Sequence, residues 1–323
     1  MATTAEQRDL LRAWEIGPIQ SIAQPAAGTV NQTWLVTATT GRYALRTYRH
    51  HDRAPVAREH AIIAHVRARG LPAVGPLPLP GGGTILERGG RYHALFPLAP
   101  GRQVPRPALG PAEALAMGAC LGRLHRALAN LPAEWAVRRT FAVDRDATLA
   151  GIARLEAAIG GRPAHDADDA AALAWLAGQR AWLERCPADA RVDLTPLAHQ
   201  VIHGDYQETN LFFARGRVSA VIDWDQTYAA PRAWEVARAL HLNFAFAPAL
   251  CLPFLAAYRA ALPLPPADLD RAVAAYALKV GHDLWVYEER YLRGNERVRR
   301  FFQPGGFVSP AAHWARLRPL LPA

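Results

Sequence analysis

The sequence predicts an α+β fold in which a small, strand-rich lobe precedes a larger lobe made mainly of helices. Three observations predict this class. Early in the chain, short runs of β-branched and aromatic residues alternate with glycine-containing turns. In most of the rest, apolar residues recur at helical spacing. Between the two, residues 97–101 (Pro-Leu-Ala-Pro-Gly) interrupt both patterns, so the predicted lobes are 1–97 and 98–323.

The first lobe is predicted to hold two pairs of strands and one helix. Residues 33–39 and 42–48 are predicted strands that a Thr-Gly turn joins into a hairpin. Residues 55–69 are predicted to form a helix, because a proline stands near its first position and a glycine directly follows its last. Strand character returns at 84–86 and 92–96, on either side of a Gly-Gly turn.

In the second lobe, one short strand-rich stretch interrupts a mainly helical pattern. The predicted helices cover 112–128, 147–159, 167–185 and most of 232–300. Short apolar runs at 201–202, 211–214 and 218–222 have the length and composition of strands, and an Arg-Gly turn predicts a hairpin between the last two. Polar clusters follow the first and the last of these runs, where side chains emerge from a buried scaffold.

Composition indicates a folded chain and argues against a nucleic-acid partner. Of the 323 residues, 51% are hydrophobic and nine are tryptophan, which is atypical of disorder. The net charge of +9 comes from scattered arginines, and no basic stripe with interleaved aromatic residues is present, so no nucleic-acid partner is expected. The three cysteines are odd in number and far apart, which argues against a disulfide framework and against a metal-binding CxxC site.

No membrane association is expected. The N-terminus lacks an apolar segment with a cleavage signal. The most apolar later stretch, 244–258, is too short to span a bilayer comfortably and contains two prolines. We therefore expect a cytoplasmic protein, and the sequence leaves its oligomeric state open.

The strongest chemical signal consists of two polar clusters, His-Gly-Asp-Tyr-Gln-Glu-Thr-Asn at 203–210 and Ile-Asp-Trp-Asp at 222–225. Phosphoryl transfer from ATP needs a carboxylate to take the proton of the acceptor hydroxyl, oxygen ligands for Mg²⁺ and cations over the phosphates. Asp205 and Asn210, five residues apart, supply a base and a metal-binding amide on one loop, and Asp223 supplies an anionic ligand. Such hard oxygen ligands suit Mg²⁺ rather than zinc.

An isolated His-x-Asp pair usually only satisfies the hydrogen bonds of a buried loop. Here the Asp-x-x-x-x-Asn spacing is followed, after a predicted hairpin, by Ile-Asp-x-Asp. Four positions must agree for this pattern to arise, which makes the catalytic interpretation much stronger than a single motif would.

These motifs resemble those of the aminoglycoside phosphotransferase and choline-kinase group, within the protein-kinase-like superfamily. Residues 203–210 are similar to its H-G-D-x-x-x-x-N loop, and Val-Ile-Asp-Trp-Asp to its I-D-[FW]-[DE] motif. The resemblance implies a two-lobed kinase-like fold and the use of ATP and Mg²⁺. It implies that Asp205 is the catalytic base, that His203 shapes the catalytic loop, and that Asn210 and Asp223 hold Mg²⁺. It leaves open whether Asp225 helps to bind the metal or braces the loop.

The same resemblance assigns nucleotide-binding roles in the first lobe. Gly28 and Asn31 lie where a turn between two strands covers the phosphates, although the segment is not G-x-G-x-x-G. Arg46 takes the place of the strand lysine that pairs with the phosphates of ATP. No lysine is available there, because the only lysine of the chain is Lys279. An arginine is always charged and offers a planar fork to phosphate oxygens, so the exchange is chemically workable.

Glu59 and one backbone segment complete the expected nucleotide site. Glu59, on the predicted helix 55–69, is the expected partner of Arg46, although a solvated helix carboxylate is a close alternative. Backbone groups from Phe96 to Leu98 are expected to bind adenine. His125, at the end of the predicted helix 112–128, is expected to be structural.

Two rival functions fit parts of the sequence. The segment 223–227 also fits D-x-D-x-T, the aspartyl nucleophile motif of haloacid-dehalogenase-like phosphatases, but that interpretation places the motif late in the chain and leaves 203–210 without a role. A pseudokinase that binds nucleotide and regulates a partner is the second alternative. The missing lysine favours it, and the presence of Asp205, Asn210 and Asp223 opposes it.

The acceptor is expected to be a small molecule with a hydroxyl group: an amino-alcohol, a hydroxy amino acid or an aminoglycoside-like compound. The carboxylate of a hydroxy amino acid suits the arginine-rich chain. The aromatic residues Trp285, Tyr287 and Tyr291 either form a cage for a quaternary ammonium group or belong to the core, and we favour the core. The acidic run at 166–169 either faces a polycationic acceptor or lies on a solvated helix, and we favour the helix.

Overall fold

A computed structural model of the chain describes residues 4–25, 32–139, 141, 143–302 and 305–321. The chain divides into two compact units. The first comprises Met1–Val137, Gln200–Ala229 and Pro253–Pro263, and the second comprises Arg138–His199, Ala230–Leu252 and Leu264–Ala323. Each unit is described by itself. The lobe boundary between residues 97 and 98 is not tested by this division and stays a prediction.

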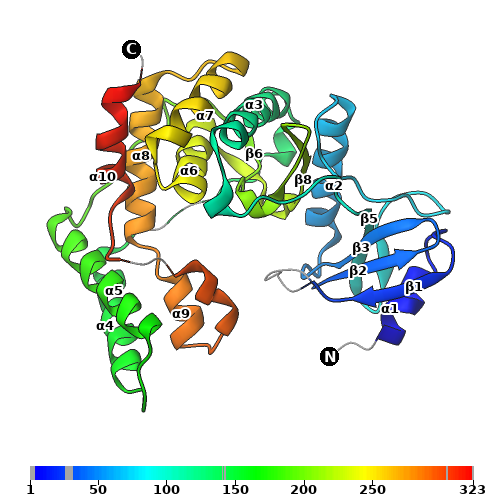
Figure 1. Cartoon of the computed structure of the whole chain (residues 1–323), viewed down its shortest axis with the longest axis horizontal. Helices are drawn as coiled ribbons and strands as arrows, with labels where there is room; N and C mark the ends of the chain where they lie inside the picture. Colours follow the sequence, from blue (N-terminus) through cyan, green and yellow to red (C-terminus); the bar gives the residue numbers. More distant parts are fainter. Residues whose placement is uncertain (1–3, 26–31, 140, 142, 303–304, 322–323) are drawn as a thin grey trace. The chain divides into compact units, whose positions relative to one another are not determined.

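The first unit begins with an antiparallel sheet of five strands in the order β1-β2-β3-β5-β4 (Figure 1). The strands are β1 (Ile19–Ala23), β2 (Gln32–Ala38), β3 (Gly41–Thr47), β4 (Leu86–Arg88) and β5 (Arg91–Pro97). The predicted hairpin is confirmed as β2 and β3, one residue earlier than expected. Its register pairs Thr33 with Arg46, and Arg46 pairs in turn with Ala94 on β5.

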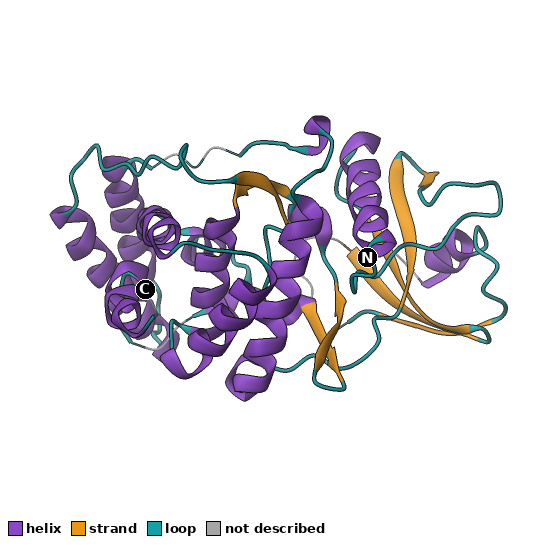
Figure 2. Ribbon diagram, turned by 90° about the horizontal axis from the view of Figure 1, so that it is seen from above, coloured by secondary structure: helices purple, strands orange, loops and turns teal. Residues whose placement is uncertain are grey.

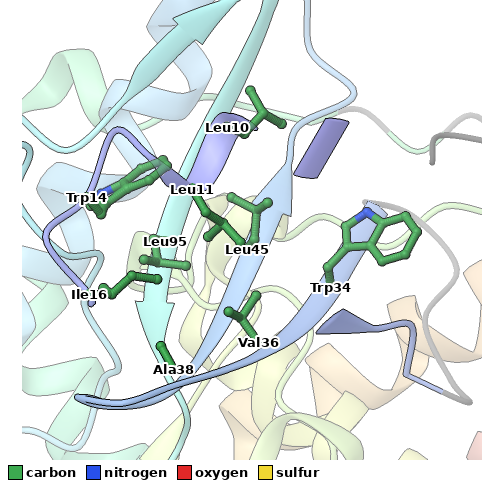
Figure 3. Close-up of a cluster of buried hydrophobic side chains, with 9 residues drawn as sticks. All are labelled: Leu10, Leu11, Trp14, Ile16, Trp34, Val36, Ala38, Leu45 and Leu95. Carbon is green, nitrogen blue, oxygen red and sulfur yellow. The ribbon is translucent and has the colours of Figure 1, made fainter. Parts of the chain in front are cut away.

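One helix lies on each side of this sheet (Figures 1 and 2). Side chains alternate between the faces of a strand, so alternate residues of β2 point to the same face. On one face, apolar residues from α1 (Thr4–Leu11) and the segment after it pack with residues of the strands (Figure 3). The members of this cluster are Leu10, Leu11, Trp14, Ile16, Trp34, Val36, Ala38, Leu45 and Leu95. The other face packs against α2 (Arg53–Ala68), through Tyr48, Val56 and Ala94.

Helix α2 carries Glu59 toward the sheet. Asp52 caps its first turn, because the Asp52 side chain accepts a hydrogen bond of 3.0 Å from Ala54 N. The buried side of the helix includes Glu59 and His60 among apolar residues. The predicted helix at 55–69 is confirmed, with its start two residues earlier.

The rest of the first unit supplies the motif-bearing loops. It contains α3 (Pro111–Leu128), the two-stranded sheet of β6 (His199–Ile202) and β9 (Tyr228–Pro231), and the hairpin of β7 (Leu211–Ala214) and β8 (Arg217–Val221). Helix α3 approaches the second half of α7 (Pro248–Ala261) at Gly118, where a Cβ atom would stand 2.0 Å from Phe254 O. His125 is fully buried and its Nδ1 lies 2.7 Å from the Tyr258 hydroxyl, so its structural role is confirmed.

The secondary structure of the second unit is mainly helical in its described part. Its helices are α4 (Arg145–Gly160), α5 (Ala167–Arg185), α6 (Arg232–Phe244), α8 (Pro266–Gly281), α9 (Trp285–Tyr291) and α10 (Pro310–Leu317). Helices α4 and α5 lie side by side, and α8 packs against α6 and α10 (Figure 1). Gln179 on α5 donates a 2.8 Å hydrogen bond to Gly281 O at the end of α8.

The acidic run at the start of α5 is not simply a solvated helix face. Asp166 caps the helix, and Asp169 is 1% exposed. Asp169 accepts a hydrogen bond of 2.9 Å from the Tyr291 hydroxyl and pairs with Arg162. The expectation of solvation is therefore wrong for Asp169, because it completes the capping box and joins α9 to α5.

The aromatic residues of α9 divide between core and surface. Tyr287 belongs to the buried cluster formed with α4 and α5, whereas Trp285 is 45% exposed. In the described part of the chain, no helix is both long enough and apolar enough to cross a bilayer.

Candidate active site

The loop that follows β6 is fastened to the end of β8 by His203, which is completely buried. The Asp205 backbone N–H donates to His203 Nδ1 at 3.2 Å, so this nitrogen is an acceptor and the proton lies on Nε2. His203 Nε2 therefore donates to Ile222 O at 3.0 Å. The neutral imidazole bridges two backbone segments, and this geometry supports a positioning role rather than contact with reactants.

The carboxylate of Asp205 is held by two amide groups. Gln207 Nε2 and Asn210 Nδ2 donate to Asp205 Oδ2 at 2.9 Å and 2.8 Å. Asn210 Nδ2 also donates to Asp205 O at 2.9 Å. The Asn210 amide nitrogen is thus engaged by Asp205, and its side-chain oxygen is the atom left to bind a cation.

Gln207 was missed by the sequence analysis, although it lies only two residues after Asp205. The available signal was an amide close to the expected base, and an amide is a suitable donor to a carboxylate. Because its hydrogen bond ends on Oδ2, Gln207 helps to fix the orientation of the carboxylate.

Asp223 lies directly after β8 in a left-handed backbone conformation, with φ of 65°. Aspartate tolerates this conformation better than most residues. The next residue, Trp224, is 1% exposed, donates its indole N–H to Val221 O at 3.1 Å and packs edge-on against His203, with ring centres 4.7 Å apart. The buried Trp224 therefore holds this tight turn in place. The Asp223 side chain, at the tip of the turn, is 36% exposed.

The Arg46 side chain, on β3, contacts three carboxylates: one on α2 and two in this turn. Its Nη1 lies 3.2 Å from Glu59 Oε1 on α2. Its Nη2 lies 2.8 Å from Asp223 Oδ1 and 3.1 Å from Asp225 Oδ2. The side chains of Arg46, Glu59 and Asp225 are 11%, 4% and 5% exposed. The predicted contact between Arg46 and Glu59 is present, and the contacts with Asp223 and Asp225 were not predicted.

Burial and mutual charge shift the pKa values of this cluster. Burial raises the pKa of Glu59 to about 7, against the opposing effect of Arg46 and with a further rise from Asp225 and Asp223. Partial burial also raises the pKa of Asp223, again opposed by Arg46. Burial alone would lower the pKa of Arg46, but the carboxylates, Glu59 first, raise it above its ordinary value. The guanidinium stays charged and is shared by three carboxyl groups.

The donor set fits a magnesium ion. The Ile222 N–H donates to Asn210 O at 3.0 Å, so the chain segments that carry Asn210 and Asp223 are adjacent. Their side chains offer an amide oxygen and a carboxylate, and Mg²⁺ is commonly bound by one or two such ligands together with water and substrate phosphates. Among the described residues, no group of three or more His, Cys, Asp or Glu side chains is arranged to hold a metal. Two protein ligands of this kind suit a metal that arrives with phosphates.

The remaining predicted nucleotide-binding residues are placed only in part. Phe96 lies on β5 opposite Ala44, with its ring edge-on to His60 at 6.0 Å. The Leu98 amide donates to Arg42 O at 2.9 Å, so the sheet uses this donor. Gly28 and Asn31 lie outside the described residues.

A buried polar chain lies behind Arg46. The guanidinium lies over the Tyr48 ring at 5.1 Å. The Tyr48 hydroxyl lies 2.9 Å from His60 Nε2, and His60 Nδ1 lies 2.7 Å from Thr84 Oγ1. Burial, with the positive charges of Arg46 and Arg53, lowers the pKa of His60 to about 4. His60 is therefore neutral at physiological pH.

We expect His60 to make stability depend on pH between about 4 and 6.5. In this window the unfolded state binds more protons than the folded state, so the free energy of unfolding rises with pH, by ~3 kcal/mol in total from this residue. Urea denaturation from pH 4.5 to 7 should show a shallower rise for His60→Gln than for the unmodified protein. Equal slopes would mean that His60 titrates in the same way in both states.

Comparison with known proteins assigns this chain to a class of enzymes. A model of the phosphotransferase enzyme family matches residues 21–274. The chain belongs to this phosphotransferase enzyme family. The alternative with an aspartyl nucleophile is excluded, since Asp223 follows a strand of an antiparallel hairpin within this kinase-like fold.

The chain is similar to several homoserine kinases. It is 30% identical over 230 residues to a homoserine kinase of Xanthobacter autotrophicus, which covers 68% of this chain and 63% of that protein. It is 27% identical over 267 residues to a homoserine kinase of Brucella anthropi, which covers 80% and 76%. The match to the Xanthobacter protein therefore spans less than two thirds of its length.

Solved structures share the fold at low sequence identity. A spectinomycin phosphotransferase, solved with ADP and spectinomycin, has a TM-score of 0.67 at 14% identity over 98% of both chains. An amicoumacin kinase, solved with AMP-PNP and Ca²⁺, has a TM-score of 0.57 at 16% identity over 93% of this chain and 94% of that one. The predicted α+β, protein-kinase-like fold is confirmed.

Proposed function

We propose that this chain is an ATP- and Mg²⁺-dependent phosphotransferase that moves the γ-phosphate of ATP to the hydroxyl group of a small molecule, and that the acceptor is a hydroxy amino acid of the homoserine type. One observation carries the proposal: the carboxylate of Asp205, fixed by Gln207 and Asn210, is tied through His203 to the turn that holds Asp223 beside Arg46. A base, a metal-binding edge and a phosphate-binding cation thus belong to one connected arrangement.

Each residue has a defined task in the proposed reaction. Asp205 accepts the proton of the acceptor hydroxyl as the oxygen attacks the γ-phosphorus, while the bond from this phosphorus to the bridging oxygen breaks and ADP leaves. Asn210 and Asp223 would hold Mg²⁺, which would neutralise charge on the phosphate oxygens. Arg46 pairs with the phosphates, Glu59 keeps the Arg46 side chain in place, and His203 aligns the two loops.

Asp225 is assigned a bracing role, because its side chain is 5% exposed and contacts Arg46. A metal-binding role for it is not needed in this arrangement. The segment from Phe96 to Leu98 and the turn with Gly28 and Asn31 are proposed to bind adenine and phosphate. With ATP as the donor, the proposed place of action is the cytoplasm.

Two observations support a hydroxy amino acid as the acceptor. Homoserine kinases are similar to this chain along most of its length. The chain also carries a net charge of +9, which favours an acceptor with a carboxylate over a polycation such as an aminoglycoside. No comparison supports the pseudokinase alternative, and Asp205, the base that a protein without turnover would not need, is present together with Asn210 and Asp223.

The test is Mg²⁺-dependent release of ADP from ATP with a panel of acceptors. The panel contains L-homoserine, L-serine, choline, ethanolamine, spectinomycin and a generic protein substrate, with Asp205→Asn as the blank. We expect stimulation by L-homoserine or a close analogue, absent from the blank. Stimulation only by an aminoglycoside or an amino-alcohol would overturn the acceptor and keep the kinase. Nucleotide binding without turnover on any acceptor would favour the pseudokinase alternative.

A further inference from the structure

The Arg46 side chain divides its hydrogen bonds between two directions. Its Nη1 faces Glu59 Oε1 at 3.2 Å, and its Nη2 faces Asp223 Oδ1 at 2.8 Å and Asp225 Oδ2 at 3.1 Å. Glu59 and Asp225 are almost fully buried, whereas Asp223 is 36% exposed. Asp223 is therefore the one of these three carboxylates that an incoming ion reaches most easily.

Arg46 and a metal ion compete for the same carboxylate, Asp223. Asp223 is the proposed anionic ligand of Mg²⁺, and its Oδ1 accepts a charge-assisted hydrogen bond from Arg46. A free divalent cation competes with this bond for the Asp223 carboxylate and must approach a fixed positive charge. Phosphates that arrive together with the cation offer Nη2 new acceptors, so the loss of the bond to Asp223 is compensated.

We propose that Arg46 is an exchangeable counter-ion that couples metal binding to nucleotide binding: Glu59 retains Nη1, and Nη2 passes from Asp223 to the phosphates when a metal–nucleotide complex enters. This proposal rests on the proposed function of the site. It predicts that the nucleotide-free protein binds free metal weakly and that metal and nucleotide each strengthen the binding of the other.

The proposal also explains how an arginine differs from a lysine at this position. The planar guanidinium has separate donor nitrogens, so one stays on Glu59 while the other changes partner. A lysine has a single nitrogen on a flexible chain, so it lacks the planar fork that holds two partners in fixed directions. Arg46→Lys therefore preserves the charge but is expected to weaken the coupling, and it separates the effect of geometry from the effect of charge.

The test measures binding of Mn²⁺ without nucleotide, by electron paramagnetic resonance of the free ion. Arg46→Ala is expected to bind Mn²⁺ at least about tenfold more tightly than the unmodified protein, the equivalent of one charge-assisted hydrogen bond. In calorimetric titrations, Mn²⁺ should strengthen ADP binding to the unmodified protein far more than to Arg46→Ala. Because Arg46→Ala leaves Glu59 buried without its partner, the double variant Arg46→Met with Glu59→Gln, which removes both charges, repeats the measurement.

A further substitution distinguishes the possible failures. Asp223→Asn, added to Arg46→Ala, should weaken Mn²⁺ binding again. If Mn²⁺ binding depends on Asp223 but is no tighter in Arg46→Ala or in the double variant than in the unmodified protein, the exchange is overturned and the proposed function stands. If Asp223→Asn leaves Mn²⁺ binding unchanged, the metal assignment of the proposed function falls, and the exchange falls with it.

Discussion

Asp205→Asn is expected to lower kcat by about 10²- to 10⁴-fold, the range typical of the loss of a general base. The amide cannot take the proton of the acceptor hydroxyl. Asparagine has nearly the same shape, and its side-chain oxygen can still accept from Gln207 and Asn210, which now hold Asp205 Oδ2. The fold and the KM for ATP should therefore change little. Steady-state kinetics with the best acceptor, together with the thermal midpoint, measure both quantities.

The same substitution at an exposed position is the matched control. Asp193 lies outside the catalytic loop, where its carboxylate accepts from Thr195. Asp193→Asn should leave kcat unchanged. An Asp205→Asn variant with kcat within a few-fold of the unmodified protein would remove Asp205 from the role of base.

Gly204→Ala is expected to damage both stability and activity. Gly204 has φ of 81°, and a Cβ atom there would stand 2.1 Å from Gln226 O. The left-handed backbone costs alanine ~1–2 kcal/mol, and the clash adds ~1–3 kcal/mol because the neighbour is backbone rather than a flexible side chain. Since Gly204 separates His203 from Asp205, relief of the clash must move the catalytic loop, so kcat should fall as well.

Gly216→Ala isolates the contribution of the backbone. Gly216, in the turn between β7 and β8, has φ of 69° and open space where a Cβ would lie. It should therefore lose only the ~1–2 kcal/mol of backbone strain and keep its activity. Chemical denaturation of both variants gives the comparison. Equal losses of stability would show that the contact between Gly204 and Gln226 O is not a close one in solution.

Local sequence patterns predicted the elements that are defined by neighbouring residues. The hairpin of β2 and β3 and the helix α2 follow from alternation, a turn glycine and a proline near the helix start. Helix α1 and strand β1 were not predicted. Strand β1 lies at the edge of the sheet with mostly exposed or half-exposed residues, so it shows no clear alternation of apolar and polar residues.

In the candidate site, too, only the features formed by neighbouring residues could be predicted from the sequence. The motif around Asp205 is continuous in the sequence, and a resemblance to a family could assign it. The contact between Arg46 and Asp223 joins residues 177 positions apart, and only folding brings them together. The buried chain from Tyr48 through His60 to Thr84 was missed for the same reason, because nothing local distinguishes these side chains from surface residues.

The prediction that Asp169 is solvated was wrong because this side chain is buried. Asp169 stands in a run of acidic residues at a helix start, a pattern that is usually solvated. Its burial depends on Arg162 and on Tyr291, which is 122 positions away, and no feature of the run itself indicates those partners.

The central claim is that this site transfers a phosphoryl group to an acceptor hydroxyl. The most direct measurement is ³¹P nuclear magnetic resonance of the products after incubation with ATP, Mg²⁺ and L-homoserine. We expect a phosphate monoester of the acceptor in an amount equal to the ADP formed, and none with Asp205→Asn. If ADP forms with inorganic phosphate alone, at the same rate in both proteins, the site does not transfer the phosphoryl group to this acceptor and Asp205 is not the base.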